Sequence, residues 1–298
     1  MHDAASIAFV NVREGAVLDS GPDLIRQASI ELTPRTAAKV ASFGGILPAG
    51  QRVYIANLGG DDDGIVETAK RLTLEGLAPM PHIVARTTAD AQALDRLLGR
   101  LAGEAGVSQA LVLGGNNDSP SGNFSESMEL VRTGLFDKHG FQRLHFAGHP
   151  EGNPSIAPAA LNATLLCKAN FARSTDADVA LVTQFLFDAK SLVEWLHGLE
   201  CQGIDLPVHV GICGPSNPHT LLKFAISCGV GNSIKVLRNQ LRNVWTLTRP
   251  YVPNEFVRDV VAALPTLQNF AGFHVFPFGG VEKTGRWMGQ GGDPRAWG

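Results

Sequence analysis

One acidic side chain stands inside a short apolar segment, where a charge is costly to bury. Glu31 lies between Ile30 and Leu32 in the stretch Ala28–Thr33, which is typical of a buried strand. Removal of a carboxyl group from water raises its pKa, so that it can stay protonated and act as a general acid. We predict that Glu31 is the catalytic residue. The alternative is a structural ion pair between Glu31 and Arg35.

A second polar side chain, Gln184, follows the apolar run Val179–Val182. Such a run is typical of a strand buried on both faces, and Asp188 is placed to cap the helix that comes next. An amide offers both a donor and an acceptor, which suits the edge of a bound heterocycle. We expect Gln184 to face a ligand. The alternative is that it only holds a loop in place.

Short apolar segments alternate with helical patterns along the chain, which predicts a (β/α)8 barrel formed by a single domain of residues 1–298. A doubly wound sheet is the alternative. The expected strands are Ala28–Thr33, Gln51–Asn57, Ala78–Ala85, Gln109–Leu113, Leu144–Ala147, Val179–Val182, Pro207–Cys213 and Gly272–Phe276. The expected helices cover residues 36–41, 61–72, 88–103, 125–136, 159–172, 192–199, 221–225 and 255–264, with an additional helix at 229–247 and a leading arm at 1–24.

In such a barrel the carboxyl ends of all strands meet at one mouth, so polar residues near those ends converge. Besides Glu31 and Gln184, these residues are Asn57, His82, Asn116, Asn117, Asp118, His149, Glu151, Ser216 and Asn217. The histidines are dispersed without the spacing of metal ligands, and no metal site is predicted. We expect His209 and His274 to be core or pocket-wall residues.

Composition limits the classes of function. The chain has 298 residues, of which 44% are hydrophobic and 18% charged, and a net charge of −3 without a basic block. The cysteines, Cys167, Cys201, Cys213 and Cys228, form no C-x-x-C pair. No segment approaches the ~20 apolar residues of a membrane span, and phosphate-binding loops, nucleophile elbows and H-E-x-x-H motifs are missing. We expect a cytoplasmic protein without nucleic-acid or membrane partners.

Six short segments form a specific pattern through their order and spacing. Two of them read T-Q-F-L-F-D at Thr183–Asp188 and I-E-L-T-P-R at Ile30–Arg35. The shorter ones are Pro81-His82, His149–Pro154, Gly211–Asn217 and Lys223–Ala225. Together they resemble the methylenetetrahydrofolate reductase family. In that family the segment similar to Thr183–Asp188 reads T-Q-F-F-F-D, and the segment similar to Ile30–Arg35 reads E-F-x-P-P-R. The resemblance extends from about Ser29 to Met288 and implies a flavin-binding barrel, an oxidoreductase of one-carbon metabolism.

The resemblance also implies roles for individual residues. Glu31 would protonate the leaving nitrogen when the five-membered ring of methylenetetrahydrofolate opens to an iminium ion. Gln184 matches the glutamine that hydrogen-bonds the pterin and then the nicotinamide, and Phe224 matches the aromatic residue that stacks on folate or nicotinamide. The implied cofactors are FAD and either NADH or NADPH. The residues expected at the flavin are Asn57, His82, Gly114, Gly115, His149 and Arg173.

The chain departs from the family mainly on the flavin side. The family's R-G-D after the fourth strand is Gly114-Gly115-Asn116 here, and its arginine after the eighth strand is Gly280. We expect Asn116 and Asp118 to bind the pterin, with Asp118 in place of the missing aspartate as the charged acceptor. The substrate-side residues Glu31, Gln184 and Phe224 are retained.

Three hypotheses follow for the function. The first is a reductase that interconverts 5,10-methylenetetrahydrofolate and 5-methyltetrahydrofolate through FAD and NADH or NADPH. The second is a flavin-independent reductase with direct hydride transfer from the nicotinamide. The third is a non-catalytic barrel that binds folate or a partner. A homo-oligomer is one possible assembly, and the sequence leaves the oligomeric state open.

Overall fold

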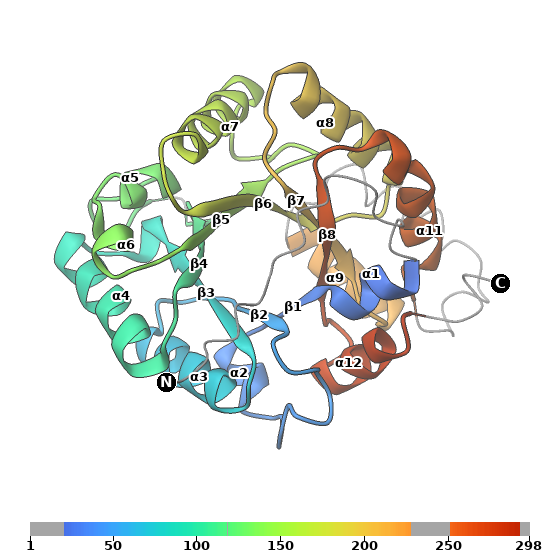
Figure 1. The fold of residues 1–298 in the computed structure, drawn as a ribbon, viewed down its shortest axis with the longest axis horizontal. Coiled ribbons are helices and arrows are strands. Elements are labelled where there is room, and N and C mark those ends of the chain that lie inside the picture. Colours follow the sequence, from blue (N-terminus) through green and yellow to red (C-terminus); the bar gives the residue numbers. More distant parts are fainter. Residues whose placement is uncertain (1–20, 118, 228–250, 293–298) are drawn as a thin grey trace, which may run out of the picture.

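The computed structural model describes residues 21–117, 119–227 and 251–292. Eight parallel strands close into a barrel in sequence order, with β8 paired to β1 (Figure 1). The strands are β1 Ser29–Leu32, β2 Arg52–Ile55, β3 Ala78–Val84, β4 Gln109–Leu113, β5 Arg143–Gly148, β6 Asp178–Phe185, β7 Val208–Cys213 and β8 Phe270–Phe276. The predicted (β/α)8 barrel is confirmed, and every expected strand overlaps an observed one.

Helices surround the barrel, as Figure 1 shows most clearly for α4, α7, α8 and α11. The helices are α1 Gly21–Gln27, α2 Pro34–Ala37, α3 Asp62–Leu74, α4 Ala91–Ala105, α5 Ser127–Val131, α6 Leu135–Lys138, α7 Pro158–Ala172, α8 Ala189–Cys201, α9 Pro218–Ser227, α11 Asn254–Ala263 and α12 Val281–Gly289. Short 3-10 turns lie at η1 Ala85–Thr87 and η3 Leu264–Thr266. Among the described residues, no helix has the length and apolar character needed to cross a membrane.

Some helical boundaries differ from those expected. The single helix expected over 125–136 is divided into α5 and α6, because Gly134 between them adopts a φ of 70°, a left-handed conformation that interrupts a helix. Residues 21–24 of the expected arm belong to α1, and neither α1 nor α12 was predicted. The remainder of the arm and the expected helix at 229–247 lie outside the described residues.

Alternation along the strands separates two packing layers. Ile30, Val53 and Val112 belong to the main core between barrel and helices, whereas Tyr54 belongs to a smaller cluster of buried residues with Met80, Leu111 and Val182. Glu31 pairs in register with Tyr54 across β1 and β2 and therefore points to the same face of the sheet. Because that face is the inside of the closed barrel, the Glu31 side chain is directed into the interior.

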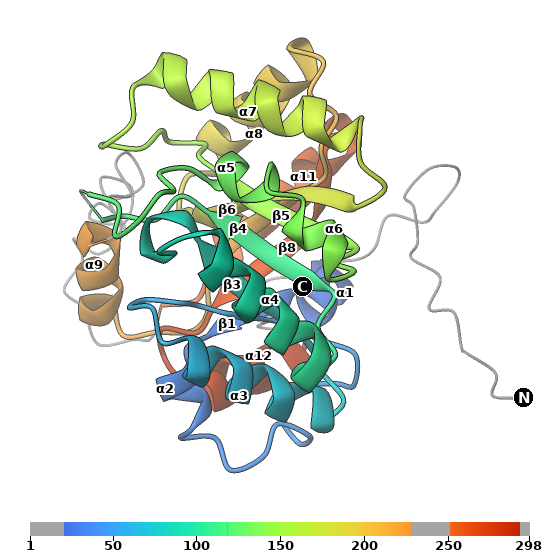
Figure 2. The ribbon, with the colours of Figure 1, turned by 90° about the vertical axis from the view of Figure 1, so that its left-hand side faces the viewer.

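The two ends of the barrel differ in what covers them. In Figure 2, α9, which follows the carboxyl end of β7, lies to the left of the barrel, and α1, which precedes β1, lies to the right. The mouth formed by the carboxyl ends of the strands is thus on the α9 side. Gln184 stands one residue before the end of β6, so it belongs to this mouth.

An irregularity in β6 sets the position of Gln184. The register between β6 and β7 shifts between Val182 and Phe185. Gly211 of β7 fits into this shift, with its N–H donating to Thr183 Oγ1 at 2.8 Å and its carbonyl accepting from the Leu186 N–H at 3.1 Å. A Cβ on Gly211 would lie 2.5 Å from Thr183 O and 2.6 Å from the Gln184 carbonyl carbon. Glycine is therefore needed at position 211 for the two strands to approach.

Replacement of Gly211 by alanine should lower the free energy of unfolding by about 1–3 kcal/mol, because the added methyl group has no space against the β6 backbone. Urea unfolding measures this change. The matched control is Gly198→Ala in α8, where a Cβ has no neighbour within 4 Å and the same substitution should stabilise the helix by roughly 0.5–1 kcal/mol. Equal effects at both positions would contradict the close approach of β6 and β7.

Candidate functional site

The Glu31 carboxylate lies between two imidazole rings inside the barrel. Glu31 Oε2 is 3.3 Å from His82 Nε2 on β3 and 3.6 Å from His274 Nε2 on β8. Both histidines are buried, and their Nε2 atoms have no other hydrogen-bond partner among the described residues. The Glu31 side chain keeps 20% of its surface exposed, so it can still be reached from the mouth. His82, predicted at the flavin, is therefore a neighbour of Glu31.

The environment of Glu31 corrects two expectations. Burial would raise the pKa of Glu31, but hydrogen bonds from His274 and His82 outweigh it and lower the pKa to about 2. The expected raised pKa is therefore wrong, and Glu31 is ionised at neutral pH. The alternative ion pair with Arg35 is also not formed, because Arg35 is exposed and Glu31 instead faces the two histidines. An ionised Glu31 accepts hydrogen bonds rather than donating a proton by itself.

Further polar rings lie deeper in the barrel. Ser29 Oγ is 2.9 Å from His274 Nδ1 and fixes the orientation of that ring. The Tyr54 hydroxyl is hydrogen-bonded to His145 Nδ1 at 2.6 Å, which joins β2 to β5 across the interior. The rings of His145 and His209 are stacked with centroids 5.0 Å apart. The barrel interior thus contains a connected cluster of aromatic and imidazole side chains beneath Glu31.

Burial keeps the deeper histidines neutral. Desolvation lowers the pKa of His209 to about 3, and that of His145 well below its ordinary value. Burial also lowers the pKa of His274, although the nearby Glu31 carboxylate opposes this effect. A neutral imidazole can donate through one nitrogen and accept through the other, which suits a hydrogen-bonded interior.

This cluster was not predicted from the sequence as part of the site. His209 and His274 were expected to be core or pocket-wall residues, which agrees with their burial, and no role was predicted for Tyr54 or His145. The available signal was strand parity, since a polar or imidazole residue occurs at an interior position in most of the strands. Parity could show that these residues share the interior, but not which of them touch.

Gln184 occupies the end of β6, as predicted, but its amide is partly engaged. Gln184 Oε1 accepts a hydrogen bond from the Phe185 N–H at 3.2 Å, and the side chain is half-buried. This local bond agrees with the alternative that Gln184 holds the loop. The amide NH2 group makes no hydrogen bond within the described part of the chain. Gln184 can therefore serve the local turn and a ligand together.

Three phenylalanine rings form a stacked column on the side of the mouth near β8 and α9. The rings of Phe276 and Phe278 have centroids 5.8 Å apart at 21°, and those of Phe278 and Phe224 lie 4.3 Å apart at 14°. Phe185, next to Gln184, packs edge-on against Phe278 at 5.0 Å. Phe224, predicted to stack on the substrate, is 38% exposed and forms the outer end of the column. Phe278 thus contacts both Phe224 and Phe185, the residue next to Gln184.

The loop after β4 is held by hydrogen bonds from Arg86, which lies in the η1 turn after β3. Arg86 donates to the carbonyls of Asn117 and Ser125, so its guanidinium group is already engaged. Gly115 adopts a φ of 102°, and a Cβ there would lie 2.8 Å from Val84 Cγ1. Gly114 accepts from the Arg86 N–H, which makes the Gly114–Gly115 pair part of a tight turn.

Asn116 and Asp118, the residues predicted to bind the pterin, both belong to this loop. Asn116 is exposed on the loop that follows β4. Asp118, which we expected to supply the charged acceptor, lies outside the described residues. Both assignments therefore stay predictions.

Two other predicted cofactor residues serve local structure. Asn57 Oδ1 accepts from the Gly60 N–H at 2.8 Å, so that backbone group is used within the turn after β2. His149, after β5, has its pKa lowered to about 4 by burial and by the charge of Lys168. His149 is consequently neutral at physiological pH and offers no positive charge to a phosphate.

A buried lysine at the end of β5 was missed by the sequence analysis. Lys168 on α7 donates from Nζ to the Ala147 carbonyl at 2.8 Å, and the residue is only 4% exposed. Burial lowers its pKa to about 8. Because Ala147 is the residue before the last one of β5, Lys168 holds the end of this strand against α7.

Arg173, predicted to bind the flavin phosphates, is not at the mouth. It is the C-cap of α7, and β6 begins a few residues later at Asp178. A helix that returns from the carboxyl end of β5 to the amino end of β6 ends on the opposite side of the barrel. There Arg173 donates to Asn170 Oδ1 and to the Gly203 carbonyl. Its role is to hold the α7 and α8 connections.

The residues assigned to FAD therefore do not fit a flavin site. Arg173 lies at the wrong end of the barrel, His149 is neutral, and the Gly60 N–H is already bonded. His82 is occupied with Glu31. A pyrophosphate needs charged or N–H donors that point at it, and these residues do not present them together.

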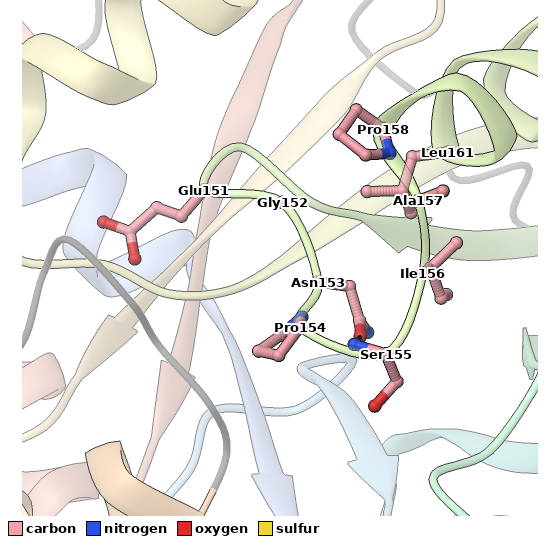
Figure 3. A pocket seen from close by; sticks show the side chains of 9 residues that line it. All are labelled: Glu151, Gly152, Asn153, Pro154, Ser155, Ile156, Ala157, Pro158 and Leu161. Carbon is pink, nitrogen blue, oxygen red and sulfur yellow. Dashed lines mark hydrogen bonds between the residues drawn. The ribbon is translucent and has the colours of Figure 1, made fainter.

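A cavity of about 550 Å³ lies in the β5–α7 connection, within residues 151–161 (Figure 3). None of the residues predicted for catalysis, substrate or cofactor lines it. Figure 3 shows Glu151 turned away from the other side chains of this loop. A smaller cavity of about 220 Å³ lies at the mouth between the first two strands and includes Asn57 and Arg35 in its lining. The described part of the chain holds no group of three or more metal-ligand side chains.

Comparison with known proteins supports the fold. A scan against models of protein families found no match. Among solved structures, the chain superposes with a TM-score of 0.59 and 11% identity on an uncharacterized protein from Clostridium thermocellum that binds two copies of 5-methyl-5,6,7,8-tetrahydrofolic acid, covering 90% of this chain and 95% of that one. The carboxyl transferase domain of Rhizobium etli pyruvate carboxylase follows with a TM-score of 0.40 and 12% identity over 88% of this chain and 53% of that one. At such identities the likeness concerns the fold.

The lowered pKa of Glu31 makes stability depend on pH in a defined window. Above pH 4.5, its ordinary pKa, Glu31 is ionised in both folded and unfolded chains, and its contacts contribute fully to stability. As the pH falls toward the folded pKa of about 2, that contribution is lost. Between pH 5 and pH 3 wild type should lose about 2 kcal/mol relative to Glu31→Gln, measured by urea unfolding.

The control for this measurement is Glu67→Gln, which changes the same group on the exposed face of α3. Glu67→Gln should follow the wild-type pH dependence. If Glu31→Gln did so as well, the carboxylate would not be held by the two histidines.

Proposed function

We propose that this barrel binds a reduced folate at the mouth formed by the carboxyl ends of its strands. The observation that carries the proposal is the ionised Glu31 carboxylate, buried between two histidines yet reachable from the mouth. A charged acceptor in such a place suits the edge of a pterin, which carries an amino group and a ring N–H. The folate-binding barrel of similar fold from Clostridium thermocellum supports the same ligand class.

The other residues of the mouth complement the same ligand. Gln184 has an amide NH2 group that can donate to a pterin carbonyl or ring nitrogen. The stacked rings of Phe278 and Phe224 give this side of the mouth an aromatic border that suits the aminobenzoyl ring of folate. A folate combines a pterin with an aminobenzoyl ring. Glu31 as acceptor and Gln184 as donor suit the pterin, and the phenylalanine rings suit the aminobenzoyl ring.

Hydride transfer to methylenetetrahydrofolate directly from NADH or NADPH is a second candidate function. The observation that favours it is the contact of Glu31 with both His82 and His274. A proton that the Glu31 carboxylate takes up from solvent would pass to the leaving nitrogen when the folate ring opens, while the two imidazoles hold the carboxylate in place. Hydride from the nicotinamide would then reduce the iminium carbon and give 5-methyltetrahydrofolate. Because the residues expected at the flavin do not fit it, no step is assigned to FAD.

Titration with 5-methyltetrahydrofolate by calorimetry tests the binding. Wild type should bind one or more equivalents. Glu31→Gln should weaken binding by roughly 10–100-fold, because it removes a charge-assisted hydrogen bond worth about 1.5–3 kcal/mol. Gln184→Ala should weaken it by roughly 2–10-fold, because a neutral hydrogen bond is worth about 0.5–1.5 kcal/mol. Glu67→Gln is the matched control and should bind as wild type does. No binding by folded wild type, or equal affinities for Glu31→Gln and Glu67→Gln, would contradict the proposal.

Oxidation of NADH and NADPH in the presence of methylenetetrahydrofolate separates binding from catalysis. Turnover without added FAD, lost on the order of 10²–10⁴-fold in Glu31→Gln, would establish direct transfer with Glu31 in proton transfer. Turnover that requires FAD would show that a flavin site is formed by residues other than those assigned. Folate binding without turnover under either condition would leave a non-catalytic folate-binding barrel and contradict the second candidate.

A further inference from the structure

Arg35 is a positive charge near the mouth that Glu31 does not use as a counterion. Arg35 lies four residues after Glu31, at the start of α2, and it is exposed. Because Glu31 is engaged by His82 and His274, Arg35 is not needed to neutralise it. Arg35 makes no ion pair with any other described residue.

Arg35 lines the cavity of about 220 Å³ between the β1–α2 and β2–α3 connections. The apolar part of the lining comes from Pro34, Ala56, Leu58 and Ile65. Thr33, which follows β1 directly, also lines it, so the cavity begins two residues beyond Glu31 in the chain. The cavity therefore lies beside the carboxyl end of the strand that carries Glu31.

A second charge in the lining narrows the choice of ligand. Asp61 is the N-cap of α3 and accepts from the Gly64 N–H at 2.9 Å. The Asp61 carboxylate can also accept a hydrogen bond from an amide N–H of a ligand in the cavity. Arg35 together with Asp61 thus suits a chain that carries an amide N–H and a terminal carboxylate.

We infer that the Arg35 cavity is a subsite for the carboxylate tail of an acyl-amino-acid group, with Arg35 as its anion-binding residue and the apolar wall beside it. This assignment rests on the proposed folate binding, because the aminobenzoylglutamate part of a folate has that chemistry. A guanidinium group binds a carboxylate through two parallel hydrogen bonds, which gives direction as well as charge. The subsite is separate from the ring-binding contacts at Glu31 and Gln184.

Binding of N-(4-aminobenzoyl)-L-glutamate, which is the tail without the pterin, tests the subsite directly. Saturation-transfer NMR or calorimetry should detect weak binding to wild type, and Arg35→Gln should weaken it by about 10-fold or more. Arg35→Lys keeps the charge but not the paired geometry and should lie between the two. Arg96→Gln, at an exposed position on α4, is the matched control and should leave the affinity unchanged.

A second comparison uses ligands with and without the tail. Arg35→Gln should weaken 5-methyltetrahydrofolate by about 10-fold and leave the tailless 6-methyltetrahydropterin unchanged. Equal loss for both ligands, or no difference between Arg35→Gln and Arg96→Gln, would overturn the subsite. Arg35-dependent binding of inorganic pyrophosphate without binding of the aminobenzoylglutamate would also overturn it, in favour of a nucleotide phosphate.

These measurements separate the subsite from the proposed function. If wild type bound neither folate nor tetrahydropterin but bound aminobenzoylglutamate through Arg35, the subsite would stand and folate binding would fail. If wild type bound both reduced ligands and Arg35→Gln changed neither, folate binding would stand and the subsite would fail. Circular dichroism of each variant confirms that the barrel is folded.

Discussion

A carboxylate inside a barrel is stable only if the protein replaces the water around it, since the cost of desolvating one ion is several kcal/mol. For Glu31, the imidazole rings of His82 on β3 and His274 on β8 take the place of that water. Ser29 in turn orients His274. The result is a fixed, ionised acceptor at the mouth. The same contact removes the need for Arg35 as a counterion, so both the proposed ring-binding site and the proposed tail subsite depend on one buried interaction.

The closed parallel sheet brings residues from distant parts of the chain to this acceptor. β1, β3 and β8 supply Glu31 and its two histidines, while the shifted register of β6 against β7 presents Gln184. The aromatic column from Phe276 to Phe224 borders the mouth. The groups assigned to a flavin are instead used in turns, helix ends or the Glu31 contact. These residues do not present the charged and N–H donors together that the phosphates of FAD would need.

The sequence was sufficient for the fold because apolar periodicity is a local property. The fourth strand, Gln109–Leu113, was predicted to the residue, and Glu31 was identified because a charge interrupts an apolar segment. The partners of Glu31 and the direction of its pKa shift depend on barrel closure, which no local pattern encodes. Arg173 was misplaced by the resemblance, although the expected helix at 159–172 already put it at the carboxyl end of that helix, just before the sixth strand and thus opposite the mouth. The division between α5 and α6 depended on the conformation of a single glycine.

A crystal structure of the protein with 5-methyltetrahydrofolate tests the central claim most directly. The amino group and ring N–H of the pterin should lie about 2.7–3.2 Å from the Glu31 carboxylate, with Gln184 at the same ring and His82 and His274 still in contact with Glu31. A pterin bound in the β5–α7 cavity or outside the barrel, with Glu31 contacting only its two histidines, would contradict the role of Glu31 as the ligand's acceptor.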